Sequence, residues 1–204
     1  MTAERVTIAS VVEGEGEIAA LPVVLRRLMF DMQIWNADIQ RPFLMDRGRL
    51  VKRGGLEAAV DGLARRLPPA APGGILVVID ADDDCPAALG PALLKRAEVV
   101  RPDRRIAVVL ANREFEAWFI AAAPSLCGRA GLPDDLASPE DCEQPRDCKG
   151  WLSRRRNDGG SYRPRVDQPA LADAFDMDMA RVNAPSFDKF CRDIGYLIKG
   201  KRED

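Results

Sequence analysis

The chain has 204 residues, of which 47% are hydrophobic and 30% are charged, and its formal net charge is −2. This composition suits one globular domain with a core of its own and room for a small appendage. The chain therefore lacks the overall positive charge that is common in nucleic-acid-binding domains, although this does not exclude a local basic face. The chain contains no histidine, which excludes Ser-His-Asp and Cys-His catalysis and histidine-ligated metal sites.

The five cysteines are an odd number without CxxC spacing. They favour reduced thiols over a disulfide framework or a zinc site. No apolar run is long enough to span a membrane and no signal peptide is visible, so we expect a soluble, cytoplasmic protein. The chain also lacks the P-loop pattern GxxxxGKS or GxxxxGKT, and nucleotide hydrolysis by that route is not expected.

The N-terminal part predicts a strand, a glycine-rich turn and a helix. Residues 6–12 form an apolar, β-branched run that is typical of a buried strand. Glu13 follows the strand, and the glycines beyond it allow a tight turn and the close approach of a ligand. A helix is expected from Glu17 to Met32, where Glu17 complements the helix dipole whatever else it does.

The next segment contains an ambiguous stretch and a basic, glycine-bearing loop. We expect a second strand around 38–44 and an amphipathic helix over 56–67. The loop between them could hold phosphates ahead of that helix, and the alternative is a solvated surface loop. Its candidate phosphate-binding residues are Arg47, Arg49, Lys52 and Arg53.

The most distinctive stretch is the apolar run 74–79, which ends in four acidic residues, Asp80, Asp82, Asp83 and Asp84. Such a run is typical of a strand buried on both faces of a parallel sheet. Asp80 and Asp82 are two residues apart, so on an extended chain both point to the same side. Two such carboxylates repel each other unless a cation compensates them, and Mg²⁺ prefers carboxylate oxygen. The alternative is that the aspartates cap the following helix.

The pattern of strand and helix continues beyond the aspartates. A helix is expected over 86–99, a buried strand over 106–110, and another helix with Asn112 as its N-cap. Arg113, Glu114 and Glu116 would then stand at the same sheet edge as Glu13 and Asp80. The alternation predicts an α/β fold, in which a parallel sheet of about four strands is flanked by helices.

The C-terminal part differs in composition from residues 1–123, which we assign to the α/β core. Residues 124–165 are rich in proline, glycine and charge, and helices return over 170–182 and from Ser186, a candidate N-cap, to Leu197. We therefore expect 124–204 to form a loop-rich basic insertion and C-terminal helices that pack on the core. Arginines near aromatic residues suit nucleic-acid strands, and a flexible charged insertion is the alternative. These arginines are Arg154, Arg155, Arg163 and Arg165.

The order and strand-end placement of the acidic residues resemble the TOPRIM domain of topoisomerases, primases and OLD-type nucleases. The matching motifs are Val12-Glu13-Gly14 and Asp80-Ala81-Asp82. More closely, the chain looks like a family of small, largely uncharacterised bacterial TOPRIM-like proteins. The motifs that carry this resemblance are Val12-Glu13-Gly14-Glu15-Gly16-Glu17, residues 80–84, Arg113-Glu114-Phe115-Glu116-Ala117-Trp118 and Ser186-Phe187.

The resemblance implies Mg²⁺- or Mn²⁺-dependent phosphoryl transfer on nucleic acid. Asp80 and Asp82 would hold the metal ion, with Asp84 as an additional ligand and Glu13 as a ligand or general acid/base. Glu17 and Glu116 are further acidic candidates, and Arg113 and the basic loops would neutralise phosphates.

The chain is too short for the additional domains of a topoisomerase or primase, so a nuclease for DNA or RNA is the activity we expect. OLD-type nucleases carry an ATPase, which implies a separately encoded ATPase partner here. The main alternative is a non-catalytic metal-binding or interaction module that regulates such an ATPase. A small-molecule phosphatase is a third hypothesis, and it would normally carry its aspartates on the first strand.

Overall fold

The fold is built on a parallel sheet that five strands form. A computed structural model describes residues 5–69 and 72–202 of the chain. The strand order is β2-β1-β4-β5, and β3 also pairs with β1. All the pairings are parallel, which confirms the expected α/β class. The strands are β1 (Thr7–Val12), β2 (Asp38–Ile39), β3 (Phe43–Leu44), β4 (Gly73–Asp80) and β5 (Ile106–Ala111).

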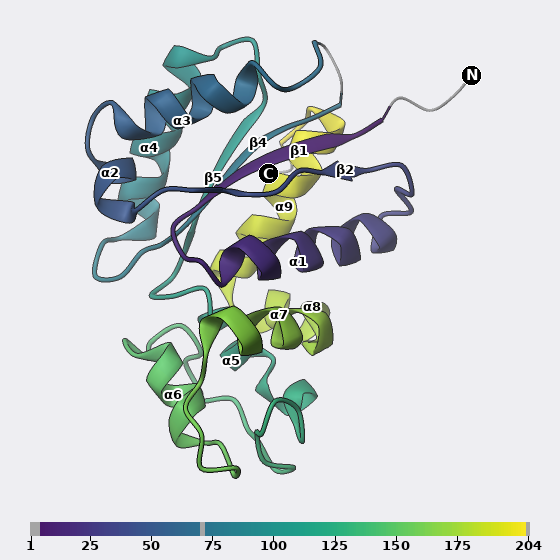
Figure 1. The fold of residues 1–204 in the computed structure, drawn as a ribbon, viewed down its shortest axis with the longest axis vertical. Helices are drawn as coiled ribbons and strands as arrows, with labels where there is room; N and C mark the ends of the chain where they lie inside the picture. The colour runs from purple at the N-terminus through teal and green to yellow at the C-terminus, as the bar shows by residue number, and fades with distance from the viewer. Residues whose placement is uncertain (1–4, 70–71, 203–204) are drawn as a thin grey trace.

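Helices cover both faces of the sheet, and a further group lies beyond the carboxyl ends of its strands (Figure 1). The helices are α1 (Glu17–Asp31), α2 (Arg47–Val51), α3 (Gly55–Ala64), α4 (Pro86–Val100), α5 (Ala117–Ala121), η1 (Ala123–Leu126), α6 (Cys148–Arg154), α7 (Pro164–Ala174), α8 (Met177–Asn183) and α9 (Pro185–Lys199). Helices α5 to α8 occupy the lower half of Figure 1, with α7 beneath α1. None of the helices in the described residues is both long and apolar enough to cross a membrane.

Alternate residues of the central strand β4 pack into two separate hydrophobic clusters. Ile75, Val77 and Ile79 contact the cluster that contains α3 and α4. Leu76 and Val78 belong to the cluster on the other face, which contains α1 and α9. Side chains two residues apart share a face of a strand, so Asp80, which follows Val78 by two, is directed toward the α1 face. This register carries the Asp80 carboxyl group into the molecule.

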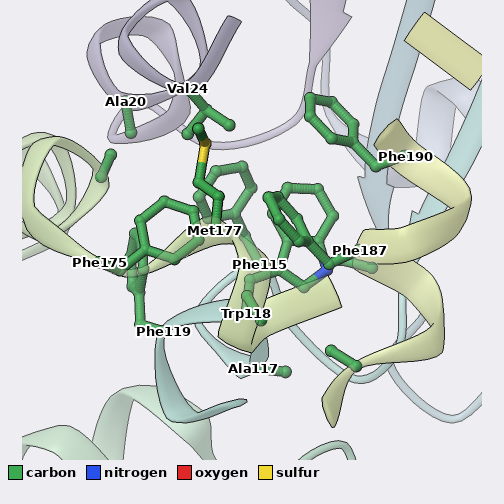
Figure 2. Packing of buried hydrophobic residues seen from close by; sticks show 14 of the residues in the cluster. Ala20, Val24, Phe115, Ala117, Trp118, Phe119, Phe175, Met177, Phe187 and Phe190 are labelled. Carbon is green, nitrogen blue, oxygen red and sulfur yellow. The ribbon is translucent and has the colours of Figure 1, made fainter. Parts of the chain in front are cut away.

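An aromatic cluster joins the sheet layer to the C-terminal helices. Trp118 lies 5.1 Å from Phe187 and 5.0 Å from Phe190, measured between ring centroids, and Figure 2 shows how these rings pack. Phe119 contacts Phe175 edge to face at 5.3 Å. The described part of the C-terminal segment, residues 124–202, therefore shares a core with the rest of the chain, and the expected division after residue 123 falls at the start of η1.

Several expected element boundaries are wrong. Asn112 does not cap a helix: α5 begins at Ala117, and the Asn112 side chain donates to Glu143 at 3.0 Å. Between them the chain turns at Arg113, which has a φ of 66°. Ser186 is likewise not an N-cap, because Ala184 caps α9 and the Ser186 hydroxyl accepts a hydrogen bond from Trp118. Residues 38–44 form two short strands instead of one.

Candidate functional site

A pocket of about 850 Å³ opens at the carboxyl ends of β1 and β4. In parallel α/β sheets this edge is where ligands usually bind. The walls come from segments that are far apart in the sequence: the β1–α1 turn, the start of α2, the end of β4, the start of α6 and the start of α7. The charged side chains that line the pocket are Glu13, Glu15, Glu17, Asp46, Arg47, Asp80, Asp82, Lys149, Arg163 and Arg165.

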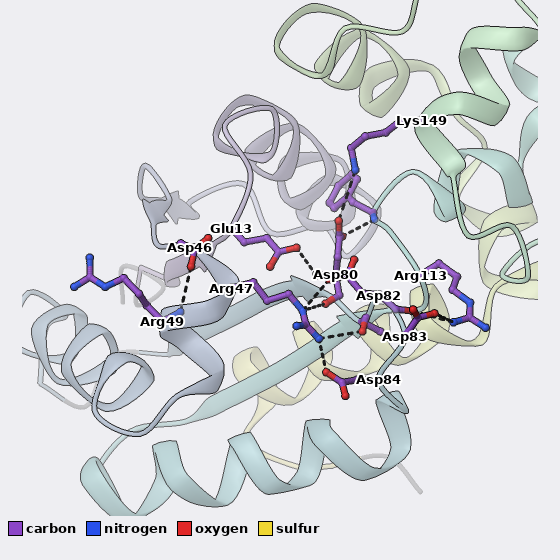
Figure 3. A network of polar contacts seen from close by, with 12 residues as sticks. Glu13, Asp46, Arg47, Arg49, Asp80, Asp82, Asp83, Asp84, Arg113 and Lys149 are labelled. Atoms are coloured by element: carbon purple, nitrogen blue, oxygen red, sulfur yellow. Dashed lines mark hydrogen bonds and ion pairs between the residues drawn. The ribbon is translucent and has the colours of Figure 1, made fainter.

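Asp80 lies at the floor of this pocket and is only 7% exposed. Its Oδ1 accepts a hydrogen bond of 2.7 Å from the backbone N–H of Phe115, and its Oδ2 lies 3.7 Å from Nζ of Lys149 (Figure 3). Burial raises the pKa of Asp80 well above its usual value, and the nearby carboxyl of Glu17 raises it further. Asp80 is thus held rigidly where a charged carboxylate is costly.

Asp82 and Asp84 turn away from Asp80 toward Arg47. The strand ends at Asp80 and the backbone of Asp82 is left-handed, with a φ of 52°. The expectation that both carboxylates follow an extended chain to one side is therefore wrong. Arg47 lies 3.3 Å from Oδ2 of Asp82 and 2.5 Å from Oδ2 of Asp84, and it also donates to the carbonyl of Asp80 (Figure 3). Asp82 lines the pocket, and Asp84 braces Arg47.

Glu13 and Glu17 bring two further carboxyl groups to the same floor. Oε1 of Glu13 accepts a hydrogen bond of 3.1 Å from the backbone N–H of Asp80. The other buried oxygen of Glu13, and Oε2 of Glu17, have no hydrogen-bond partner among the described residues. Burial raises the pKa of Glu13. Burial, together with the charges of Glu13 and Glu116, raises the pKa of Glu17 to about 8, so Glu17 holds a proton at neutral pH in this arrangement.

Lys149 is the cation at the centre of the buried acids, and the sequence analysis missed it. Its Nζ lies 3.0 Å from Glu116 and 3.1 Å from Glu114, in addition to its approach to Asp80. Burial alone lowers the pKa of Lys149, but the three carboxylates outweigh burial and raise it. Glu116 is fully buried, and burial raises its pKa. Lys149 is the second residue of α6, inside a loop-rich stretch where no local pattern marks it.

The expected metal ligands do not form a ready-made metal site. Within residues 5–69 and 72–202, no three Asp, Glu, Cys or His side chains are arranged to hold a metal ion. Asp82 faces Arg47 and Asp80 faces Lys149, so cations of the chain take the places beside these carboxylates. The chemistry of the donor set nevertheless fits Mg²⁺, because all its members are oxygens and the partnerless oxygens of Glu13 and Glu17 lie beside Asp80.

Only part of the expected basic surface lies at the pocket. Arg47, Arg163 and Arg165 line it, whereas the remaining six candidates do not. Arg113 binds the carbonyl of Asp82, and Arg154 pairs with Asp147. The others are Arg155, which stacks on Trp151 at 3.7 Å, and the loop residues Arg49, Lys52 and Arg53.

Residues 162–168 form a wall of the pocket that the sequence analysis recognised only through its arginines. Tyr162 and Gln168 are buried, and the Tyr162 hydroxyl and Gln168 Oε1 have no hydrogen-bond partner in the described part of the chain. Both residues line the pocket beside Arg163 and Arg165. Their contribution depends on α7 packing against α1, a long-range contact that local patterns do not encode.

Comparisons with known proteins identify a family without supplying an activity. No curated protein and no solved structure matches the chain. A family described as "Domain of unknown function (DUF4276)" matches residues 12–195. That span includes the lining residues from Glu13 to Gln168 and most of α9. The chain therefore belongs to the DUF4276 family.

Proposed function

We propose that this protein is a divalent-metal-dependent phosphodiesterase that hydrolyses nucleic acid. The observation that carries the proposal is the pocket at the sheet edge, where Glu13, Glu17 and Asp80 lie together beneath Arg47, Arg163 and Arg165. Buried acids with perturbed pKa values in a cleft are typical of catalytic sites. The resemblance of the acidic motifs to the TOPRIM domain belongs to the same proposal.

Glu13, Asp80 and Asp82 are the residues that would hold Mg²⁺ or Mn²⁺, with Asp84 close by on Arg47. When bound, the ion would stabilise charge on the phosphate and lower the pKa of an attacking water. For the ion to bind, Asp80 would have to release Lys149 and Asp82 would have to release Arg47, because each carboxylate is ion-paired with that cation.

The chain's own residues supply the remaining functions of a phosphodiesterase. Arg47, Arg163 and Arg165 line the pocket at positions from which they can neutralise backbone phosphates. Lys149 adds a positive charge beside Asp80. Glu17, whose pKa of about 8 keeps it protonated near neutral pH, would donate a proton from its carboxyl group to the leaving oxygen.

The decisive experiment is cleavage of labelled DNA and RNA oligonucleotides by the purified protein in Mg²⁺ and in Mn²⁺, with EDTA as the blank. We expect Asp80→Asn and Glu13→Gln each to reduce the rate by more than about 100-fold. Glu140→Gln, which changes an exposed carboxylate outside the pocket, should leave it unchanged. Cleavage that survives both substitutions would show that the assigned site is wrong.

A non-catalytic module is the second candidate, and one observation favours it. Arg47 and Lys149 already neutralise the acids without a metal ion. Such a module would bind a separately encoded ATPase and would show neither cleavage nor divalent-ion binding. Calorimetric titration with Mg²⁺ and co-purification with an ATPase encoded beside it distinguish this candidate from the phosphodiesterase.

A further inference from the structure

The acidic floor lies too deep to meet a phosphate on the outside of a large ligand. Asp80 is 7% exposed and Glu17 is 4% exposed, and both line the pocket. A phosphodiester that reacts there must enter the pocket. This depth bears on the substrate class, because a single strand can insert a nucleotide into a pocket, whereas the nucleotides of a duplex are held in base pairs.

The pocket wall formed by residues 162–168 and α7 is fixed to the β1–α1 segment at both ends of α7. At its start, a Cβ atom on Gly16 would lie 2.1 Å from Oε1 of Gln168 and 2.7 Å from the carbonyl oxygen of Pro164, so the two backbones are in close contact. At its end, Arg27 of α1 donates hydrogen bonds of 2.8 Å to the carbonyls of Ala172 and Phe175. The wall cannot swing aside without breaking these contacts.

The size of the pocket matches a short piece of one strand. Its volume is about 850 Å³, within the range of small-molecule sites. A cube of that volume has an edge of about 9 Å, whereas the major groove alone of B-form DNA is about 12 Å wide. A pocket of this size therefore cannot enclose a duplex, whereas it can hold one to a few unpaired nucleotides.

The charges around the pocket suit a single strand as well. Arg47 lies on one side, half-buried, and Arg163 and Arg165 lie on the α7 side with most of their side chains in solvent. Cations that follow the backbone are a usual element of single-strand binding sites.

From this depth, fixed wall, size and charge we infer that the substrate is a single nucleic-acid strand, or an unpaired end, that enters the pocket between Arg47 and the start of α7. Intact duplex is excluded. The inference rests on the proposed function for the identity of the reacting site, but it concerns binding and can be tested without cleavage.

The test measures the binding of the full-length protein to fluorescent 12-nucleotide strands in EDTA by anisotropy. The arms are single-stranded DNA, single-stranded RNA and the corresponding blunt duplexes. We expect at least one of the single strands to bind about ten-fold more tightly than its duplex or better. The double variant Arg163→Ala/Arg165→Ala should weaken this binding and reduce the slope of log affinity against log salt by about 1.4. Arg66→Ala, an exposed arginine outside the pocket, is the matched control.

Duplexes that bind as tightly as the single strands, or a double variant that behaves like Arg66→Ala, would overturn the inference. Absence of binding by every nucleic acid would overturn it too. Preferential binding of a single strand that is not cleaved in Mg²⁺ or Mn²⁺ would contradict the proposed phosphodiesterase activity and support the strand preference. Cleavage of a closed circular duplex would support the phosphodiesterase activity and overturn the preference for single strands.

Discussion

Lys149 determines whether the buried acids can coexist in the folded protein. Its ammonium lies within 3.1 Å of Glu114 and of Glu116, and 3.7 Å from Asp80. Carboxylates gathered without a cation repel one another and lose hydration. The same ammonium can attract a substrate phosphate, and it occupies the place beside Asp80 that a metal ion would take. Both the stability of the fold and the proposed activity therefore depend on this side chain.

We therefore predict that Lys149→Met lowers the free energy of unfolding at pH 7 by about 2 kcal/mol. The complete loss of one partner from a buried pair costs about 3–5 kcal/mol, and the lower figure allows for the solvent that still reaches Lys149. The loss should shrink at pH 5, because burial raises the pKa values of Asp80 and Glu116 and these carboxyl groups take up protons first. Urea unfolding followed by circular dichroism at both pH values measures it.

Lys52→Met is the control, because Lys52 is exposed and lies outside the pocket. Its unfolding free energy should stay within about 0.5 kcal/mol of the wild type. An equal loss for both variants, or a Lys149→Met loss that does not change with pH, would contradict the assigned role.

For Glu17 we predict a gain in stability on substitution, in contrast to the loss expected for Lys149. Its pKa in the folded protein is about 8, compared with a value near 4.5 in the unfolded chain. The folded state binds the proton more tightly, so its stability falls as the pH rises from 4.5 toward 8. Glu17→Gln removes the titrating group, and the variant should gain stability over the wild type between pH 5 and pH 8, by up to about 3 kcal/mol.

Thermal and urea unfolding in EDTA at pH 5, 6, 7 and 8 test this prediction without interference from metal ions. Glu140→Gln should follow the wild-type pH dependence, because Glu140 is exposed. A constant difference between Glu17→Gln and wild type across this range would refute the raised pKa.

Arginines fix the helices to one another by binding the carbonyl groups at helix ends. Arg27 binds the end of α7, Arg105 binds Leu197 and Ile198 near the end of α9, and Arg96 binds Val51 and Lys52 at the end of α2. The last carbonyls of a helix lack intrahelical partners. These bonds satisfy such carbonyls across segments up to 148 residues apart, and they hold the three arginine side chains in place.

The junction of α1 and α7 forms the pocket wall, and two glycines provide a matched test of it. Gly16→Ala places a methyl group 2.1 Å from Gln168, so we expect a loss of about 1–3 kcal/mol from overpacking. Gly62 lies inside α3 with nothing within 4 Å of an added Cβ. Gly62→Ala should instead gain up to about 1 kcal/mol from helix propensity.

Chemical denaturation of both variants measures these changes. The Gly16→Ala protein should also bind a single strand more weakly than Gly62→Ala does, because its wall is displaced. Equal stabilities of the two variants would mean that α7 is not tightly packed on Gly16.

Sequence reasoning identified the elements whose patterns are local. The buried strands, α1 and α4 follow from apolar periodicity, and Glu13 and Asp80 follow from their positions at strand ends. The direction of Asp82 could not be predicted, because Asp82 itself has a left-handed backbone two residues after the end of β4. Lys149 and Gln168 reach the pocket through tertiary packing of α6 and α7, for which one sequence holds no periodic pattern.

At the scale of the whole molecule, one core spans the sheet and the C-terminal helices. Phe115, Trp118 and Phe119 are fully buried against Phe175 and Phe187. Because these rings come from both sides of residue 123, neither part can bury its aromatic surface alone. The pocket spans the same junction, since Lys149 and the α7 wall belong to the C-terminal part.

We predict that the full chain unfolds in a single cooperative transition and that a fragment of residues 1–123 does not fold. The fragment would expose Trp118 and its neighbouring rings, each of which contributes about 2–3 kcal/mol when buried. Tryptophan fluorescence and far-ultraviolet circular dichroism should give coincident urea transitions for the full chain. Two separate transitions, or a fragment with a cooperative transition of its own, would show that residues 1–123 are an independent domain and that the pocket lies between two units.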